Sequence, residues 1–158
     1  MMQRRHLLLI AGGTAFAVPA ARAHHGWSSF DQSRPIYLEG KAVSVAWRNP
    51  HAELALELPD NHALPADLAG RTLPAQTAPV DGAALLKAAR RPTRADRRWE
   101  IELAPLTRMG AWQVAEIKAG DTVGVLGFTF TEEKGAPVLR AEYLWAGGKV
   151  AGLRSSPA

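Results

Sequence analysis

Short segments in which apolar and polar residues alternate constrain the fold of this 158-residue chain more than any other feature. In the cleanest segment, residues 51–58, the apolar positions are Ala52, Leu54, Leu56 and Leu58. A period of two residues is typical of a β-strand with one buried face. Further strand-like segments cover residues 36–47, 99–103, 121–130 and 139–145. The pattern therefore predicts a mainly β fold with five strands.

Two of these segments change the parity of their apolar positions part-way, near Gly40 in one and between Gly124 and Gly127 in the other. Glycine inside a strand often marks a bulge or a barrel corner, where one strand serves two faces. Short helices are predicted over residues 82–91 and 105–114. We expect a small five-stranded OB-like barrel, closed or nearly closed, with a two-layer sandwich as the alternative.

The first 23 residues have the three parts of an export signal. Arg4 and Arg5 make the start positive, residues 7–18 are apolar, and residues 21–23 read Ala-Arg-Ala before the expected cleavage point. The apolar run is too short to span a bilayer, so we expect no stable membrane anchor after cleavage. The arginine pair leaves Sec and twin-arginine export both open, and either predicts a periplasmic or secreted protein.

The expected mature chain divides into one domain over residues 24–146 and a disordered tail over residues 147–158. An insertion between strands two and three, residues 59–97, is rich in Ala, Pro and Arg and is expected to be a flexible loop. The alternative for its arginines is docking to an anionic surface.

Composition excludes several classes of function. The chain has 19 Lys and Arg, of which the signal removes Arg4, Arg5 and Arg22, leaving 16 against 15 acidic residues. Such a balance does not fit a nucleic-acid-binding protein. The chain has no cysteine, hence no disulfide and no thiolate ligand or nucleophile. Phosphate-binding loops and the GxSxG motif are absent from the sequence.

The carboxylate pairs do not indicate catalysis either. Glu53 with Glu57, and Glu100 with Glu102, point outward from their predicted strands, where we expect solvated cross-strand partners. Tryptophans 47, 99 and 145 fall on apolar parities and are expected in the core. No catalytic residue is predicted, and the chain is not expected to be an enzyme.

Four histidines remain after the predicted cleavage: His24, His25, His51 and His62. Cleavage would make His24 the first residue, so that its α-amine and Nδ1 could chelate one metal ion. His51, at the start of strand two, could supply a third nitrogen, or His25 could do so instead. Such an all-nitrogen site suits Cu(II). In the alternative interpretation the two N-terminal histidines bind nothing and His51 only caps a turn.

The sequence also resembles a family of small exported bacterial proteins catalogued as domain of unknown function 6152. The resemblance is carried by the HHGWSSFD start, the LEGKAV strand, the WRNPH motif, and the later stretches GAW and GDTVGV. It implies an exported single-domain protein and assigns no activity. It places His24, His25 and His51 inside the motifs, together with Trp47, Asn49 and Pro50 as further candidate site residues.

Two hypotheses follow from these observations. The first is an exported protein that binds copper through the histidines. The second is a non-catalytic barrel module that binds a protein, a glycan or a small ligand, without metal. The distance between the mature N-terminus and His51 distinguishes them.

Overall fold

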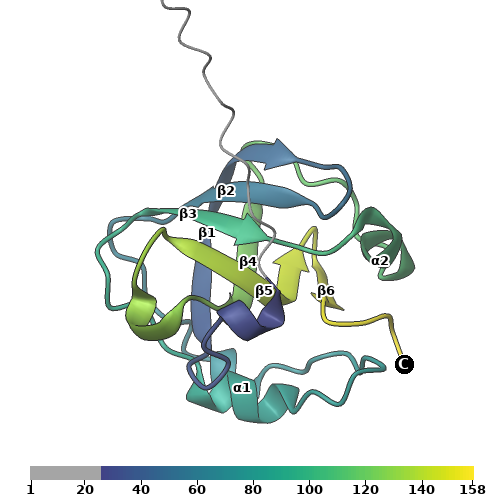
Figure 1. The fold of residues 1–158 in the computed structure, drawn as a ribbon, viewed down its shortest axis with the longest axis horizontal. Coiled ribbons are helices and arrows are strands. Elements are labelled where there is room, and N and C mark those ends of the chain that lie inside the picture. Colours follow the sequence, from purple (N-terminus) through teal and green to yellow (C-terminus); the bar gives the residue numbers. More distant parts are fainter. Residues whose placement is uncertain (1–25) are drawn as a thin grey trace, which may run out of the picture.

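The structure is a computed structural model, and it describes residues 26–158. Six strands form one sheet in the order β3-β2-β1-β4-β5-β6, and an additional β3–β5 pairing closes five of them into a barrel (Figure 1). The strands are β1 (Ile36–Ala46), β2 (Glu53–Glu57), β3 (Arg98–Glu102), β4 (Thr122–Phe128), β5 (Val138–Ala146) and β6 (Lys149–Gly152). The β3–β5 pair is parallel, and the other pairs are antiparallel. The predicted mainly β fold with a five-stranded barrel is confirmed.

Both predicted helices are present and shorter than expected. They are α1 (Gly82–Ala88), inside the insertion, and α2 (Leu106–Ala111), between β3 and β4. Three 3₁₀ turns accompany them: η1 (Trp27–Ser29), η2 (Leu68–Gly70) and η3 (Thr131–Glu133). The start of α1 is fixed by Asp81, whose side chain accepts a hydrogen bond from the Ala84 amide at 2.9 Å. Within residues 26–158, no helix has the length and apolarity needed to cross a membrane.

The barrel interior is apolar, and Trp99 of β3 is the largest of its fully buried side chains. The Trp99 indole donates a hydrogen bond to the Asp96 carbonyl at 3.0 Å, which satisfies its one polar atom. Trp47 packs half-buried against this core. Trp145 instead packs on the outside of the barrel, where its ring meets Tyr37 edge-on at 5.6 Å.

The change of parity in β1 is a β-bulge at Val43, three residues later than the sequence pattern indicates. Ala42 pairs with Leu56 of β2, and Ser44 pairs with Ala55, so Val43 is the extra residue. Its side chain is 40% exposed and does not belong to the core. The interpretation of Gly40 as a bulge was therefore wrong, whereas its interpretation as a barrel corner stays a prediction.

The irregular apolar pattern of β4 has a different cause. Val123 and Val125 belong to the barrel core, whereas Leu126 and Phe128 belong to two clusters outside it. Both faces of β4 are buried, so alternation disappears from its sequence. The register does shift between Leu126 and Gly127, but the extra residue is Glu142 on β5.

The insertion covers one outer face of the barrel, with α1 below the strands in Figure 1. Leu68 and Leu86 are buried there against Tyr37, Leu126 and Tyr143. The insertion thus adds a second apolar layer to the barrel. Its flexibility stays a prediction.

The tail after β5 was expected to be disordered, and the structure gives it a different role. Gly147 and Gly148, both with positive φ, turn the chain back so that β6 pairs with β5. Leu153 is then 1% exposed in the barrel core. The Gly- and Ser-rich composition of the tail suggested disorder, but its first two glycines form a tight hairpin turn.

Candidate functional site

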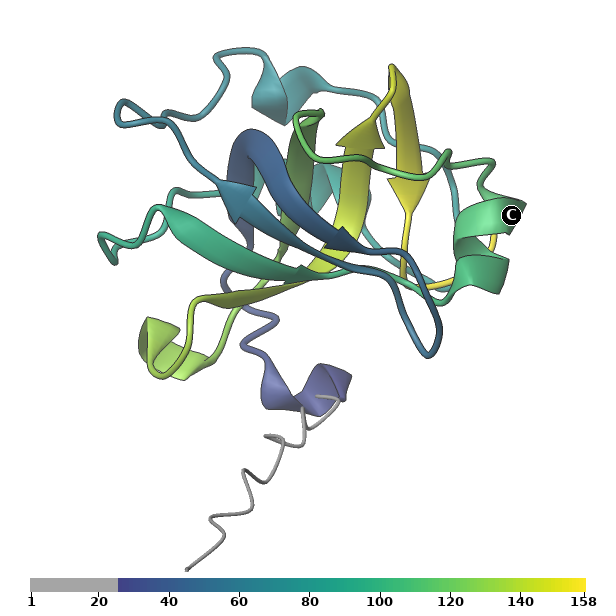
Figure 2. The same cartoon turned by 90° about the horizontal axis from the view of Figure 1, so that it is seen from above.

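Residues 26–31, the described part of the HHGWSSFD motif, are docked on the outside of the barrel (Figure 2). Phe30 is 5% exposed and its ring stacks on Phe130 at 5.1 Å between centroids. The Asp31 amide donates to the Thr129 carbonyl at 2.9 Å. Trp27 meets Phe128 of β4 edge-on at 6.4 Å. The motif is therefore an anchor that fixes where the chain enters the barrel.

Trp27 also lies against two arginines. The guanidinium carbon of Arg154 is 3.9 Å from the centroid of the Trp27 ring, and that of Arg140 is 5.1 Å away. Both distances are within the range of cation–π contacts. Arg140 belongs to β5 and Arg154 to the tail, so one ring joins the N-terminal motif to both.

His51 lies two residues before Glu53, the first residue of β2, and is 8% exposed. Its Nδ1 is 3.5 Å from Oε1 of Glu53. The neighbouring Ala52 holds the backbone in place, because its amide donates to the Ala104 carbonyl and its carbonyl accepts from the Leu103 amide, both at 2.9 Å. The imidazole therefore sits at a fixed place, beside a carboxylate.

The other motif residues shape the turn that leads to His51. Asn49 accepts a hydrogen bond from the Leu106 amide at the start of α2, at 3.2 Å. The Asn49–Pro50 peptide is cis. Trp47 is packed against the barrel core. Through these contacts, Trp47 and Asn49 stabilise the turn between β1 and β2.

A line of contacts across the outer face connects His51 with Trp27. Glu53 beside His51 pairs with Glu102 of β3, and Glu102 pairs with Arg140 of β5. Register partners of this kind carry their side chains on the same face. The Arg140 guanidinium, 3.3 Å from Oε2 of Glu102, in turn lies over the Trp27 ring.

The expectation that the outward carboxylates of the strands are solvated was wrong for Glu102. It is 4% exposed, because Arg140 and the docked N-terminal motif lie on the same face. Glu57 does behave as expected, with Arg97 at 3.6 Å and a side chain that is 38% exposed.

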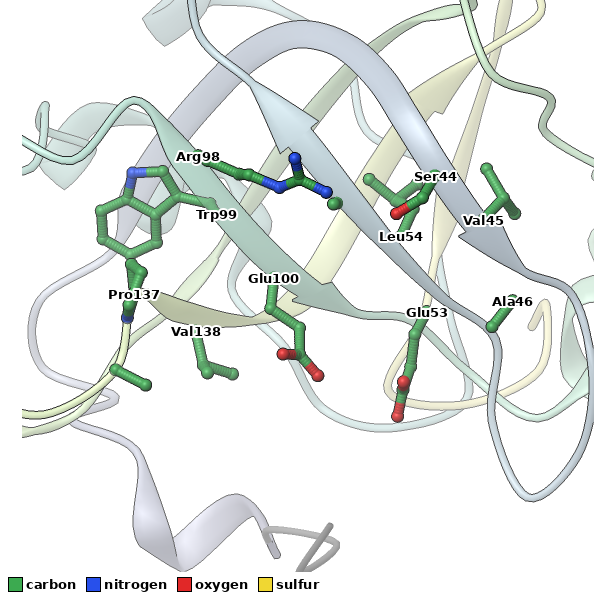
Figure 3. Close-up of a pocket in the computed structure, with 12 residues that line it drawn as sticks. Ser44, Val45, Ala46, Glu53, Leu54, Arg98, Trp99, Glu100, Pro137 and Val138 are labelled. Atoms are coloured by element: carbon green, nitrogen blue, oxygen red, sulfur yellow. The ribbon is translucent and has the colours of Figure 1, made fainter. Parts of the chain in front are cut away.

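The same face carries a shallow groove of about 480 Å³ over β1, β2 and β3. Glu53 and Glu100 extend from neighbouring strands in the same direction, while the Arg98 guanidinium lies near Ser44 at the other end (Figure 3). Pro137 and Val138 add apolar surface beside Glu100. The groove thus has an anionic end, an apolar wall and a cationic end.

His62 lies in the insertion and serves a structural role. Its Nε2 is 3.2 Å from the Tyr37 carbonyl, to which it donates as the Nε2-protonated tautomer. Burial lowers the pKa of His62, and the nearby Arg91 lowers it further. His62 is therefore held neutral in a packed position, which supports its use as a control histidine.

The arginines of the insertion bind within the chain. Arg94 pairs with Asp96 at 2.6 Å and donates to the Glu133 carbonyl at 2.8 Å. Arg97 pairs with Asp60 at 2.6 Å. These contacts favour a structural role over docking to an anionic surface.

The predicted metal ligands are placed only in part. His24 and His25 lie outside the described residues. Within residues 26–158, no three His, Asp or Glu side chains are grouped closely enough to hold a metal ion. The predicted third ligand, His51, is on the same outer face as the docked motif that follows His25.

Part of the chain matches the model of one protein family. Residues 13–66 match the model of a family described as "Family of unknown function (DUF6152)". The matched segment contains the residues of HHGWSSFD and WRNPH, and it confirms the resemblance to the family over residues 13–66, whereas the later stretches GAW and GDTVGV lie outside it. No curated protein and no solved structure matches the chain.

Proposed function

We propose that this chain, of which residues 13–66 match the model of a family without an assigned function, is an exported protein that binds Cu(II). The ligands are the α-amine and Nδ1 of His24, made N-terminal by cleavage after Ala23, together with the imidazole of His51 or His25. The observation that supports this site is a row of neighbouring residues on one face: Trp27 lies over Arg140, and Arg140 pairs with Glu102. Glu102 is the register partner of Glu53, which lies beside His51.

The reach of the chain is sufficient. Trp27 lies over β5, and His51 leads into β2, which is two strands away through β3. Neighbouring strands are about 4.8 Å apart, so the separation across the strands is about 10 Å, and the two residues from Glu53 back to His51 add about 7 Å along the strand, which gives about 12 Å in all. Residues 24–26 can extend by up to about 3.5 Å each, or about 10 Å in all. Extended residues 24–26 together with the imidazole of His51, which projects from its own backbone, can span this distance, so the proposed ligands can meet without release of the motif.

The chemistry of the pair also fits. A metal-binding histidine usually donates its second ring N–H to a carboxylate, which fixes its tautomer. Oε1 of Glu53 is 3.5 Å from Nδ1 of His51, an ion-pair separation longer than a usual hydrogen bond, and a proton held on Nδ1 by this carboxylate would leave Nε2 for the metal. An amine and two imidazoles form the nitrogen ligand set that Cu(II) prefers. Glu53 is thus proposed as an outer partner of the copper ligand.

The second candidate is a binding module without metal or catalytic activity, and the groove beside Glu53 and Arg98 favours it. Its ligand would be a protein, a glycan or a small molecule with both a cationic and an anionic group. We propose no nucleic-acid partner for either candidate, since the expected mature chain is nearly neutral.

The test is a competition titration of purified protein with a copper chelator. Protein that begins at His24 is expected to bind one Cu(II). His51→Ala removes a proposed ligand and should weaken binding by at least the tenfold to hundredfold seen when only an outer partner of a ligand is lost. His62→Ala is the matched control and should leave binding unchanged. Equal affinity of the wild type and the His51→Ala variant would exclude His51 as the third ligand and leave only His25 in that role.

A form of the protein that begins at Ala23 tests whether the α-amine of His24 takes part in metal binding. One added residue removes the amine from the ring that it makes with Nδ1 of His24, so binding should weaken. Because free α-amines titrate near pH 7.7–8.0, affinity of the His24-first form should rise up to about pH 8. Absence of copper binding by the His24-first form at pH 8 would favour the groove-binding alternative.

A further inference from the structure

We infer that the groove of about 480 Å³ over β1, β2 and β3 binds the end of a peptide chain whose last residue is lysine or arginine. The terminal carboxylate of the peptide lies at Arg98 and Ser44. Its basic side chain lies at Glu53 and Glu100 (Figure 3). We call this groove the β1–β3 groove. Its role rests on the second candidate of the proposed function, the binding module, and is independent of copper.

Small side chains make the floor of the β1–β3 groove. Ala55 is the register partner of Ser44 on β1 and of Glu100 on β3, so these three side chains lie side by side on the outer face of the barrel. Ala46 follows Ser44 by two residues and faces the same way. With only a hydroxymethyl group and two methyl groups over this area, an extended peptide can lie directly on the sheet.

The outer apolar layers of the described chain leave this part of the barrel wall uncovered. The layers formed by the insertion and by the N-terminal motif include residues of β1, β4 and β5, and neither includes a residue of β2 or β3. Arg98 is exposed, and within residues 26–158 its guanidinium forms no ion pair. The cationic end of the groove is therefore available to an anionic group of a ligand.

The two charged ends of the groove are separated by about the length of one basic residue. Glu53 is a diagonal neighbour of Ser44, about 7–8 Å away, and Glu100 is two strands from Ser44, or about 10 Å away. The four-carbon stem of lysine, with its carboxylate at the other end, spans a comparable length. Pro137 and Val138 form an apolar wall against which such a stem can pack.

A peptide fits this groove better than a free amino acid does. The α-ammonium group of a free amino acid would lie next to its carboxylate, and so beside the Arg98 guanidinium, where like charges repel. In a peptide the same nitrogen is an uncharged amide. Ligands that are recognised by stacking on aromatic rings are not favoured, because Trp99, the aromatic residue of the groove, is fully buried.

An NMR titration of ¹⁵N-labelled protein tests the inference, with N-acetyl-Ala-Ala-Lys as the probe. Saturable shifts of amide signals are expected in β1, β2 and β3 and not in α1. Two altered probes each remove one charge: the C-terminal amide of the same peptide, and N-acetyl-Ala-Ala-norleucine. Each should bind about tenfold more weakly, because one charged contact is lost. Free lysine should also bind more weakly than the probe.

Variants of the protein remove the same contacts from the other side. Arg98→Ala should bind the probe and its C-terminal amide equally, whereas Arg90→Ala, at an exposed arginine outside the groove, should behave as the wild type does. Glu100→Gln should lower the preference for the lysine probe over the norleucine probe, and the control Glu116→Gln should not. Ala55→Leu fills the floor of the groove and should weaken binding of every probe about tenfold or more.

Equal affinity of the wild type for the three acetylated probes would overturn the inference and leave the binding-module candidate standing, because the groove would then bind without recognising either charge. Unchanged binding by Ala55→Leu, or no saturable shift with any probe, would also overturn it. Copper titration of Arg98→Ala separates the inference from the first candidate. Its Cu(II) affinity should equal that of the wild type, whatever the outcome of the peptide titration.

Discussion

Arg154→Ala is expected to lower the free energy of unfolding by about 2–4 kcal/mol. The substitution removes the guanidinium that lies 2.6 Å from Oε2 of Glu142, a side chain with no exposed surface. Gln76 still donates to Oε1 of Glu142 at 2.9 Å, but a neutral amide does not balance the charge. The loss is below that of a fully buried pair, because the Arg154 side chain is 25% exposed.

Urea unfolding followed by far-ultraviolet circular dichroism measures this effect. Adding Glu142→Gln to the Arg154→Ala protein should recover part of the loss, because the uncompensated charge is then gone. Lys118→Ala provides a control, since its pair with Glu116 is exposed and should contribute less than about 1 kcal/mol. A loss for Arg154→Ala as small as that of Lys118→Ala would show that Glu142 does not depend on this arginine.

The same residue explains why the tail could not be predicted. Alternation indicated β2 most clearly, because buried and less buried residues alternate along it. β6 has four residues after two glycines, too few for a period to show. Its position is fixed by pairing with β5 and by the Arg154–Glu142 contact, which no local pattern reveals.

The second buried layer accounts for the errors in strand parity. Leu126 and Phe128 are apolar because the insertion and the N-terminal motif cover the outside of β4. In the sequence alone, apolar residues on both faces of a strand look like a change in the parity of its buried positions. The Val43 bulge was misplaced for a related reason: a glycine close by offered a simpler explanation for the change of parity.

The candidate site was predicted in part. His51 and the N-terminal histidines were identified by residue type and by their motifs. Glu53 was assigned to solvent, and Arg140 and Arg154 were missed, because their roles depend on cross-strand register and on the tail. The one available signal was Trp27, an aromatic residue directly after the histidines in the HHGWSSFD motif.

Gly40→Ala is expected to destabilise the barrel by about 2–3 kcal/mol, and Gly40→Val by more. A β-carbon at Gly40 would overlap with the Glu57 carbonyl oxygen and crowd the Leu58 backbone. Backbone atoms cannot turn aside as a side chain can, so β1 and β2 would have to separate where the barrel bends. Gly110→Ala in α2 is the matched control: nothing lies within 4 Å of its added methyl, and helix propensity predicts a gain of up to about 1 kcal/mol. Thermal and urea unfolding of both variants would decide the matter, and a Gly40→Ala protein as stable as wild type would rule out this close approach of β1 to Glu57.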